Sequence, residues 1–323
     1  MDNNMKKECR IKQFPVSFFS MILGMCGFTI AFQKAEQILQ MPIHLSWYIL
    51  MMTILFFIII SIVYLTKMIR FKDDVKNEFN HPIKLSFFPT FSISLLLLSV
   101  AFLSVSMIIS KYLWLTGTII HFIFTIKIIS IWIQHSKFEI KHMNPAWFIP
   151  AVGNILVPVA GVSHFSSEIS WFFFSIGLFF WIILLIIFFN RIIFHNPLPD
   201  KLLPTFFILI APPAVGFISF VKLTGEVNEF SKILYYFGLF IVFLLFAQIN
   251  LFRKVKFYLS WWAYSFPIAA ITIATILMFY ETNVEMFKYL SWILFSVLNI
   301  IIVSLLVKTI IATSKREICI EEE

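Results

Sequence analysis

The sequence predicts an all-α membrane protein of ten transmembrane helices, arranged as five tandem helical hairpins. The first observation is composition: 60% of the 323 residues are hydrophobic and 13% are charged, and the mean hydropathy is +0.92. Soluble domains carry about 45–50% apolar and about 25% charged residues. The second observation is a series of apolar runs, close to the roughly 20 residues that a spanning helix needs. The third is that lysine and arginine gather in alternate connections between these runs.

This composition excludes several classes of protein. With 41 Phe, 9 Trp and 9 Tyr, the chain has too much apolar surface for a soluble enzyme or a disordered protein. Runs such as Trp47–Leu65 and Trp171–Phe189 are apolar on every side, unlike the alternating segments of a membrane β-barrel. The cysteines Cys9, Cys26 and Cys319 are far apart, so neither a disulfide framework nor a metal site is indicated. The polar N-terminus leads into an apolar run without an A-x-A-type cleavage site, so we expect no removed signal peptide.

Charged and turn-forming residues divide the apolar sequence into ten spans. They lie near residues 15–35, 45–66, 83–108, 112–134, 146–163, 169–190, 202–222, 230–251, 257–279 and 287–311. The connections are short, so consecutive spans are expected to be antiparallel neighbours. The prediction is therefore one ten-helix transmembrane domain over residues 15–311, with tails at 1–14 and 312–323.

The distribution of lysine and arginine predicts the orientation of the spans. One set of connections and tails holds 19 of these residues and the opposite set holds 5, while Lys127 lies within the fourth span. Cytoplasmic segments of membrane proteins carry the excess of positive charge. Both termini are therefore predicted to be cytoplasmic, in agreement with the even number of spans. The net charge of +8 is explained by topology, and we expect no nucleic-acid partner.

The positions of proline predict which spans lie in the interior of the protein. The even-numbered spans contain none, whereas the odd-numbered spans carry Pro89, Pro150, Pro158, Pro212, Pro213 and Pro267 in their interiors. A proline within a helix removes a backbone hydrogen bond and kinks it, and the freed carbonyls need protein or water as partners. We therefore expect an inner ring of five kinked odd-numbered helices around a central pore, and an outer ring of even-numbered helices facing lipid. The alternative is that proline and small residues are simply common in transmembrane packing.

Hydroxyl and amide side chains follow the same odd-numbered spans. The first span has small residues in place of an interior proline. The predicted residues that line the pore or kink its helices are Ser20, Gly24, Pro89, Thr90, Pro150, Asn154, Pro158, Pro212, Pro213 and Pro267.

Catalytic motifs and buried acids are missing from the spans. No Asp or Glu lies in a span core, and no H-E-x-x-H pair, G-x-S-x-G elbow or Walker loop occurs. We expect no enzyme activity and no cofactor. The fourth span contains His121 and Lys127. His121 is interpreted as a packed core residue, whereas Lys127 is either a snorkelling lysine or a fixed positive charge that attracts anions.

A path lined by hydroxyls, one amide and kinked backbone, without acids, suits an anion or a neutral solute. Cation channels and proton-coupled carriers usually place acids in the membrane. Helix N-termini at proline breaks can present N–H groups to an anion without any buried charge. The residues alone thus predict a pore or carrier that favours anions over cations.

Four stretches resemble a known family, in order along the chain. Phe14–Gly27 reads FPVSFFSMILGMCG, Asn144–Asn154 reads NPAWFIPAVGN, Ile210–Gly216 reads IAPPAVG, and Trp261–Pro267 reads WWAYSFP. Together they resemble the tellurite-resistance/dicarboxylate transporter family, whose fold is shared with the slow anion channels of plant guard cells.

The resemblance implies more than the residues indicate alone. It implies a homotrimer with one pore per subunit, in the inner (plasma) membrane, and a phenylalanine plug that matches Phe266. It implies transport of small anions such as chloride or nitrate through a gated channel or channel-like transporter. The alternative is a coupled exporter of dicarboxylates or oxyanions such as malate, sulfite or tellurite-related ions. Uniform tandem hairpins without inverted halves count against that alternative.

Overall fold

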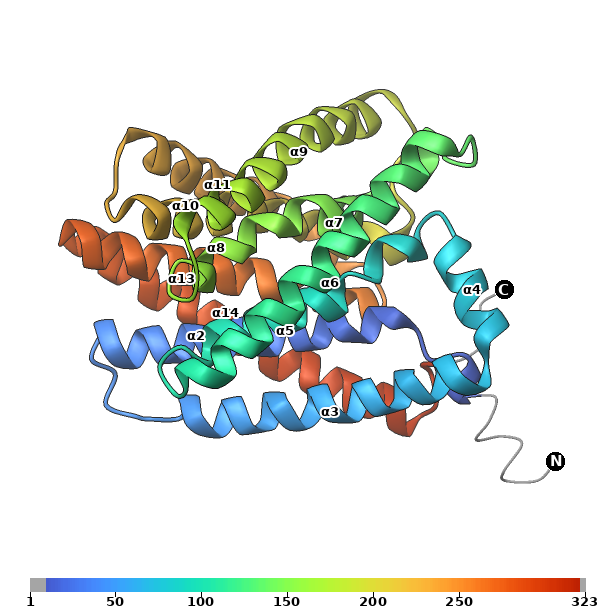
Figure 1. Ribbon diagram of the computed structural model, residues 1–323, viewed down its shortest axis with the longest axis horizontal. Coiled ribbons are helices and arrows are strands. Elements are labelled where there is room, and N and C mark those ends of the chain that lie inside the picture. Colours follow the sequence, from blue (N-terminus) through green and yellow to red (C-terminus); the bar gives the residue numbers. More distant parts are fainter. Residues whose placement is uncertain (1–9, 320–323) are drawn as a thin grey trace.

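The computed structural model describes residues 10–319, and these residues form helices and connecting loops without a strand. Figure 1 shows most of the helices lying side by side as long rods, with both ends of the chain at one end of the bundle. Most of the predicted tail 1–14 and the last four residues of the tail 312–323 lie outside the described residues. The predicted all-α membrane class is confirmed. Within residues 10–319, nine helices are long and apolar enough to cross a membrane.

The α-helices, in chain order, have the following bounds: α2 (Phe19–Ile38), α3 (Ser46–Arg70), α4 (Lys72–Asn80), α5 (Thr90–Phe102), α6 (Met107–Gln134), α7 (Phe148–Val152), α8 (Val157–Gly161), α9 (Ser167–Phe194), α10 (Ala211–Thr224), α11 (Glu229–Ala247), α12 (Ile249–Arg253), α13 (Ser265–Thr282) and α14 (Glu285–Ser314). Short 3₁₀ helices also occur: η1 (Val16–Phe18), η2 (Lys84–Phe87), η3 (Ile140–His142), η4 (Pro145–Trp147), η5 (Gly153–Leu156), η6 (Asp200–Ile210) and η7 (Leu259–Tyr264).

Each odd-numbered span begins as a 3₁₀ helix and continues as an α-helix, which corrects the expected role of proline. Pro89 is the residue before α5, and Pro212 and Pro267 lie in the first turns of α10 and α13. Proline fits in a first turn because the N–H groups there have no partner within the helix. These prolines therefore mark the change from 3₁₀ to α geometry, rather than kinking a continuous α-helix.

The segment predicted to be the fifth span differs most from its expected form. Instead of a continuous helix over 146–163, the apolar segment Pro145–Gly161 is divided into η4, α7, η5 and α8. Pro150 lies inside α7 and Pro158 in the first turn of α8, so two backbone donors are missing eight residues apart. Between them, the Asn154 side chain donates to the carbonyl of Ala151 at 2.8 Å.

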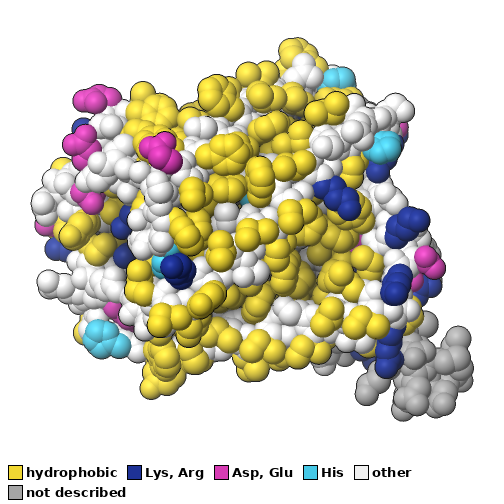
Figure 2. Space-filling view, viewed as in Figure 1, with side chains coloured by type: hydrophobic (Ala, Val, Ile, Leu, Met, Phe, Trp, Pro, Cys, Tyr) yellow, Lys and Arg dark blue, Asp and Glu magenta, His cyan; other side chains and the backbone are white. Residues whose placement is uncertain are grey.

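The spans separate by burial as the alternation of proline predicts. The most apolar stretches of the first, third, seventh and ninth spans are 67–89% buried, whereas those of the even-numbered spans are 22–39% buried. Contacts join α2 to α5, α5 to α8, α8 to α10, α10 to α13, and α13 back to α2. Each even-numbered helix packs on the segment before it: α3 on α2, α6 on α5, α9 on α7 and α8, α11 on α10, and α14 on α13. Figure 2 shows hydrophobic side chains over most of one outer face, with several Lys and Arg side chains at the end nearest the termini.

The predicted orientation can be tested by labelling single-cysteine variants. Ser166 is exposed just before α9, and Asp74 lies in α4, near the end of the bundle that carries the termini. We expect a membrane-impermeant thiol reagent to label Ser166→Cys in intact cells, and Asp74→Cys only after permeabilisation, because the lysine-rich side is cytoplasmic. Labelling in the opposite pattern would invert the assigned topology.

Candidate functional site

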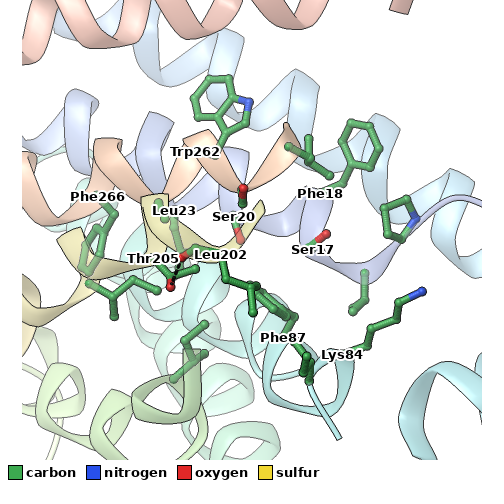
Figure 3. Close-up of a pocket in the computed structure, with 18 of the residues that line it drawn as sticks. Ser17, Phe18, Ser20, Leu23, Lys84, Phe87, Leu202, Thr205, Trp262 and Phe266 are labelled. Atoms are coloured by element: carbon green, nitrogen blue, oxygen red, sulfur yellow. Dashed lines mark hydrogen bonds between the residues drawn. The ribbon is translucent and has the colours of Figure 1, made fainter. Parts of the chain in front are cut away.

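A cavity of about 1020 Å³ lies among the inner segments, at the end of the bundle nearest the termini. Its walls include residues from η1, η2, α7, η6 and η7, which lie in the first halves of the five predicted odd-numbered spans. Figure 3 shows Phe266 at one end of the labelled lining and Lys84 at the other. Because the segments that contain α2, α5, α10 and α13 all run away from this end of the bundle, the positive ends of their backbone dipoles are directed toward the cavity.

The cavity wall is mainly aromatic and aliphatic, with a few polar groups. Its rings belong to Phe18, Phe87, Phe148, Phe257, Tyr258, Trp262 and Phe266. Its hydroxyls belong to Ser17, Ser20, Thr205, Tyr258 and Ser260, and its ionisable side chains to Glu78, His81, Lys84, Lys201, Glu317 and Cys319. Burial raises the pKa of the Cys319 thiol to about 11, so this group carries no charge at neutral pH. Such a wall offers a solute weak dipolar contacts from a few polar side chains.

Three residues separate this cavity from a second, smaller one. Phe266, Leu156 and Val215 line both the large cavity and a void of about 30 Å³. The side chains around the void are all apolar. A solute that left the large cavity in this direction would therefore meet an apolar constriction, where it must shed water and gain few contacts in return.

The position of Phe266 results from the packing of α13 on α2. Phe266 is the second residue of α13, between the 3₁₀ helix η7 and Pro267. A Cβ atom built on Gly27 would lie 3.3 Å from Cδ2 of Phe266 and 2.7 Å from Cβ of Ala269. The missing side chain at Gly27 thus makes room for the Phe266 ring between the two helices.

The structure brings four of the predicted site residues together in the cavity wall: Ser20, Pro212, Phe266 and Pro267. The others are not among the lining residues found within residues 10–319: Gly24, Pro89, Thr90, Pro150, Asn154, Pro158 and Pro213. Gly24 faces Ser265 and Trp262 of the neighbouring inner segment. Asn154 turns toward the outer helix α6, where it donates to Oγ1 of Thr125 at 3.0 Å.

Neither ionisable residue of the fourth span lines the cavity, as far as the described residues show. Lys127 is exposed on the outer helix α6, with Nζ 4.9 Å from the centre of the Phe79 ring. His121 is fully buried, with Nδ1 3.0 Å from Oγ of Ser92. Within residues 10–319, no group of three His, Cys, Asp or Glu side chains is placed to hold a metal ion.

Several lining residues were not predicted from the sequence. In the sequence, Lys84 and Lys201 indicate only topology, although both occur at the start of a predicted odd-numbered span. Their equivalent positions in two hairpins could have indicated a shared place at the cavity mouth. Leu156 and Val215 carry no comparable signal, because an aliphatic residue in an apolar helix is normally packing.

Sequence comparison finds related proteins that match almost the whole chain. Residues 13–310 match the family SLAC1, described as voltage-dependent anion channel. The S-type anion channel SLAH3 of Arabidopsis thaliana is 30% identical over 95% of this chain and 50% of its own length, and the S-type anion channel SLAH2 of the same plant is 32% identical over 92% and 59%. A tellurite resistance protein TehA homolog of Haemophilus influenzae is 24% identical over 84% of this chain and 82% of its own. The chain thus spans about half the length of the two plant relatives.

Proposed function

The chain belongs to the SLAC1 family of voltage-dependent anion channels, and on this premise we propose that it conducts small anions, such as chloride or nitrate, through its inner ring. The resemblance to the tellurite-resistance family and the plant channels is confirmed. The observation that carries the proposal is the pair of cavities along the inner helices, separated by Phe266, Leu156 and Val215.

The path is proposed to run along the axis of five tandem hairpins, with ten spans in total. The interrupted segment Pro145–Gly161 would be the fifth span, sheltered from lipid by its contacts with α6, α9 and α10. This protection matters because irregular backbone at membrane depth is tolerated only where protein or water surrounds it. An anion would enter the large cavity near Lys84 and Lys201 and then meet the apolar constriction.

Phe266 is proposed to be the gate at that constriction. Its ring occupies the boundary between the two cavities, and an apolar ring in a narrow passage blocks ions by steric closure and dewetting. Rotation of this side chain, or a small shift of α13, would join the cavities. The proposal also includes a homotrimer in the inner (plasma) membrane with both termini in the cytoplasm.

A coupled exporter of dicarboxylates or oxyanions is the second candidate. The large cavity, at about 1020 Å³, has room for an organic anion as well as a bare halide. A relative named for tellurite resistance points to the same possibility. The two functions differ in whether net charge flows without a coupling gradient.

Recording from purified protein in planar bilayers tests the channel function. Under asymmetric potassium chloride, we expect currents that reverse near the chloride equilibrium potential and need no proton gradient. Bilayers with the same amount of heat-inactivated protein are the control. Reversal on the potassium side, or flux only in the presence of a proton gradient, would contradict the channel proposal.

A further inference from the structure

A buried ion pair lies at the edge of the large cavity, between α3 and α4. Glu78 of α4 lines the cavity, and its Oε2 lies 2.6 Å from Nζ of Lys67 in the last turn of α3. The two side chains are only 6% and 4% exposed. Glu317, the other carboxylate found in the described lining, is exposed to solvent. Glu78 is thus a carboxylate buried beside a cavity that we assign to anions.

The remaining contacts of the pair connect it to the start of the first inner helix. Oε1 of Glu78 accepts a hydrogen bond from the backbone N–H of Val16 at 2.7 Å, and Val16 begins η1. The Tyr64 hydroxyl donates to Oε2 at 3.3 Å, and Nζ of Lys67 also donates to the carbonyl of Phe14 at 2.8 Å. The N-cap residue of η1, Pro15, makes no side-chain cap, so Glu78 supplies one from a separate helix.

A carboxylate in this place would oppose an anion unless its charge is balanced. In a partly buried site the effective dielectric is well below that of water, so two unit charges several ångströms apart still interact strongly. Glu78 also places negative charge at the N-terminus of an inner helix, which offsets the positive end of that helix dipole. Lys67 lies close enough to cancel the carboxylate charge at longer range.

We propose that Lys67 neutralises the capping carboxylate of Glu78, and that this pair sets the anion preference of the large cavity. Glu78 supplies the hydrogen bond that holds η1, and Lys67 removes the electrostatic penalty which that carboxylate would impose on an entering anion. The consequence for permeation rests on the proposed channel function, whereas the consequence for the potential in the cavity does not.

Thiol modification measures this potential in the full-length protein without requiring ion flow. Ser17 follows Val16, lines the cavity and is half-buried, so Ser17→Cys provides a probe once Cys9 and Cys319 are replaced by serine. The fully buried Cys26 is retained. The readout is the rate of modification by an anionic methanethiosulfonate divided by the rate for a cationic one. We expect Lys67→Met to lower this ratio by about threefold to tenfold.

Two further variants should shift the ratio of modification rates in the direction opposite to Lys67→Met. Glu78→Gln keeps an acceptor for the Val16 N–H and removes the negative charge, so alone it should raise the ratio. Added to Lys67→Met, it should return the ratio toward that of the unmodified pair. If Lys67→Met fails to accumulate because one buried charge has lost its partner, the single Glu78→Gln variant carries the test. An unchanged or lower ratio in that variant would overturn the proposal.

Lys12→Met is the matched control. Lys12 pairs with Asp74 of the same helix α4 at 3.7 Å, and these side chains are 43% and 34% exposed. The substitution changes the net charge equally but acts on a solvated pair outside the described cavity lining, where water and salt screen the charge. We expect little change in the ratio, and a fall equal to that of Lys67→Met would refute a specific role for the buried pair.

Ion flux separates this inference from the proposed function. Reversal potentials of Lys67→Met and of the double variant, recorded in a Phe266→Ala background, should show reduced and restored anion selectivity. If Phe266→Ala alone carries no anion current, the channel function is refuted, and the thiol-modification ratios still decide the role of Lys67. If current is present but Lys67→Met leaves both selectivity and ratio unchanged, the pair is purely structural and the inference is wrong.

Discussion

Replacing Phe266 with alanine is expected to raise anion flux by about tenfold or more, which corresponds to lowering the barrier by about 1.4 kcal/mol. The ring lies where the large cavity meets the apolar void, so its removal joins them and lets water accompany the ion. Selectivity among anions should change less than total flux, because the hydroxyls and backbone dipoles of the wall remain. Radiotracer or halide-quenching assays in proteoliposomes, with matched protein amounts, measure this effect.

Two phenylalanines of α9 serve as controls for the loss of a ring. Phe188 is fully buried and Phe179 is 67% exposed. Phe188→Ala should lose stability by about 3–5 kcal/mol and leave flux per folded protein unchanged, whereas Phe179→Ala should have little effect on either. If Phe266→Ala resembles Phe188→Ala, with lower stability and unchanged flux, then Phe266 is a packing residue and not a gate.

Gly24→Ala is expected to destabilise the protein strongly. A Cβ atom at Gly24 would lie 2.1 Å from Oγ and 2.7 Å from Cβ of Ser265, and 3.1 Å from Cε3 of Trp262. Ser265 is fully buried, and its hydroxyl donates to the Trp262 carbonyl at 2.6 Å, so it has no free space to enter. Helix α13 must therefore move away from α2. We expect a loss of about 1–3 kcal/mol or more, seen as a lower melting temperature of the purified protein.

Gly216→Ala provides a matched control on another inner helix. Gly216 lies within α10, and the nearest atom to its added Cβ would be Cδ1 of Leu234 at 3.5 Å, an ordinary contact. This substitution should be neutral or slightly stabilising, because alanine favours the helix by about 1 kcal/mol over glycine. Equal melting temperatures for Gly24→Ala and the wild type would contradict the close approach of α2 and α13.

The sequence predicts the helix on which Gly24 lies but not the neighbour that Gly24 contacts. The residue was assigned to the inner ring because it lies in an odd-numbered span with small and hydroxyl neighbours, and the burial of that span agrees. Its contact with Ser265 depends on the rotation and depth of α13 relative to α2, which no local pattern specifies. A small residue on an inner helix can face either the axis or a neighbouring helix, and Gly24 faces its neighbour.

The role of Phe266 could be predicted only from the family resemblance and not from the residue itself. One phenylalanine among 41 carries no signal of its own, and its candidacy came from the resemblance around Trp261–Pro267. The structure adds that Leu156 and Val215 share the boundary between the cavities with it. These aliphatic residues could not be identified in advance, because three different spans bring them together.

The sequence by itself determined the membrane class and which apolar segments are more buried than others, because composition, apolar length and the positions of proline act within each segment. Only the tertiary structure decided that the apolar segment Pro145–Gly161 is broken around Asn154, that Lys127 lies on the outside, and that Lys67 and Glu78 meet beside the cavity. Contacts of this kind depend on how helices rotate and slide against one another. The rotation and depth of each helix are set by the packing of all the side chains together, and they leave no periodic pattern in any single stretch of the chain.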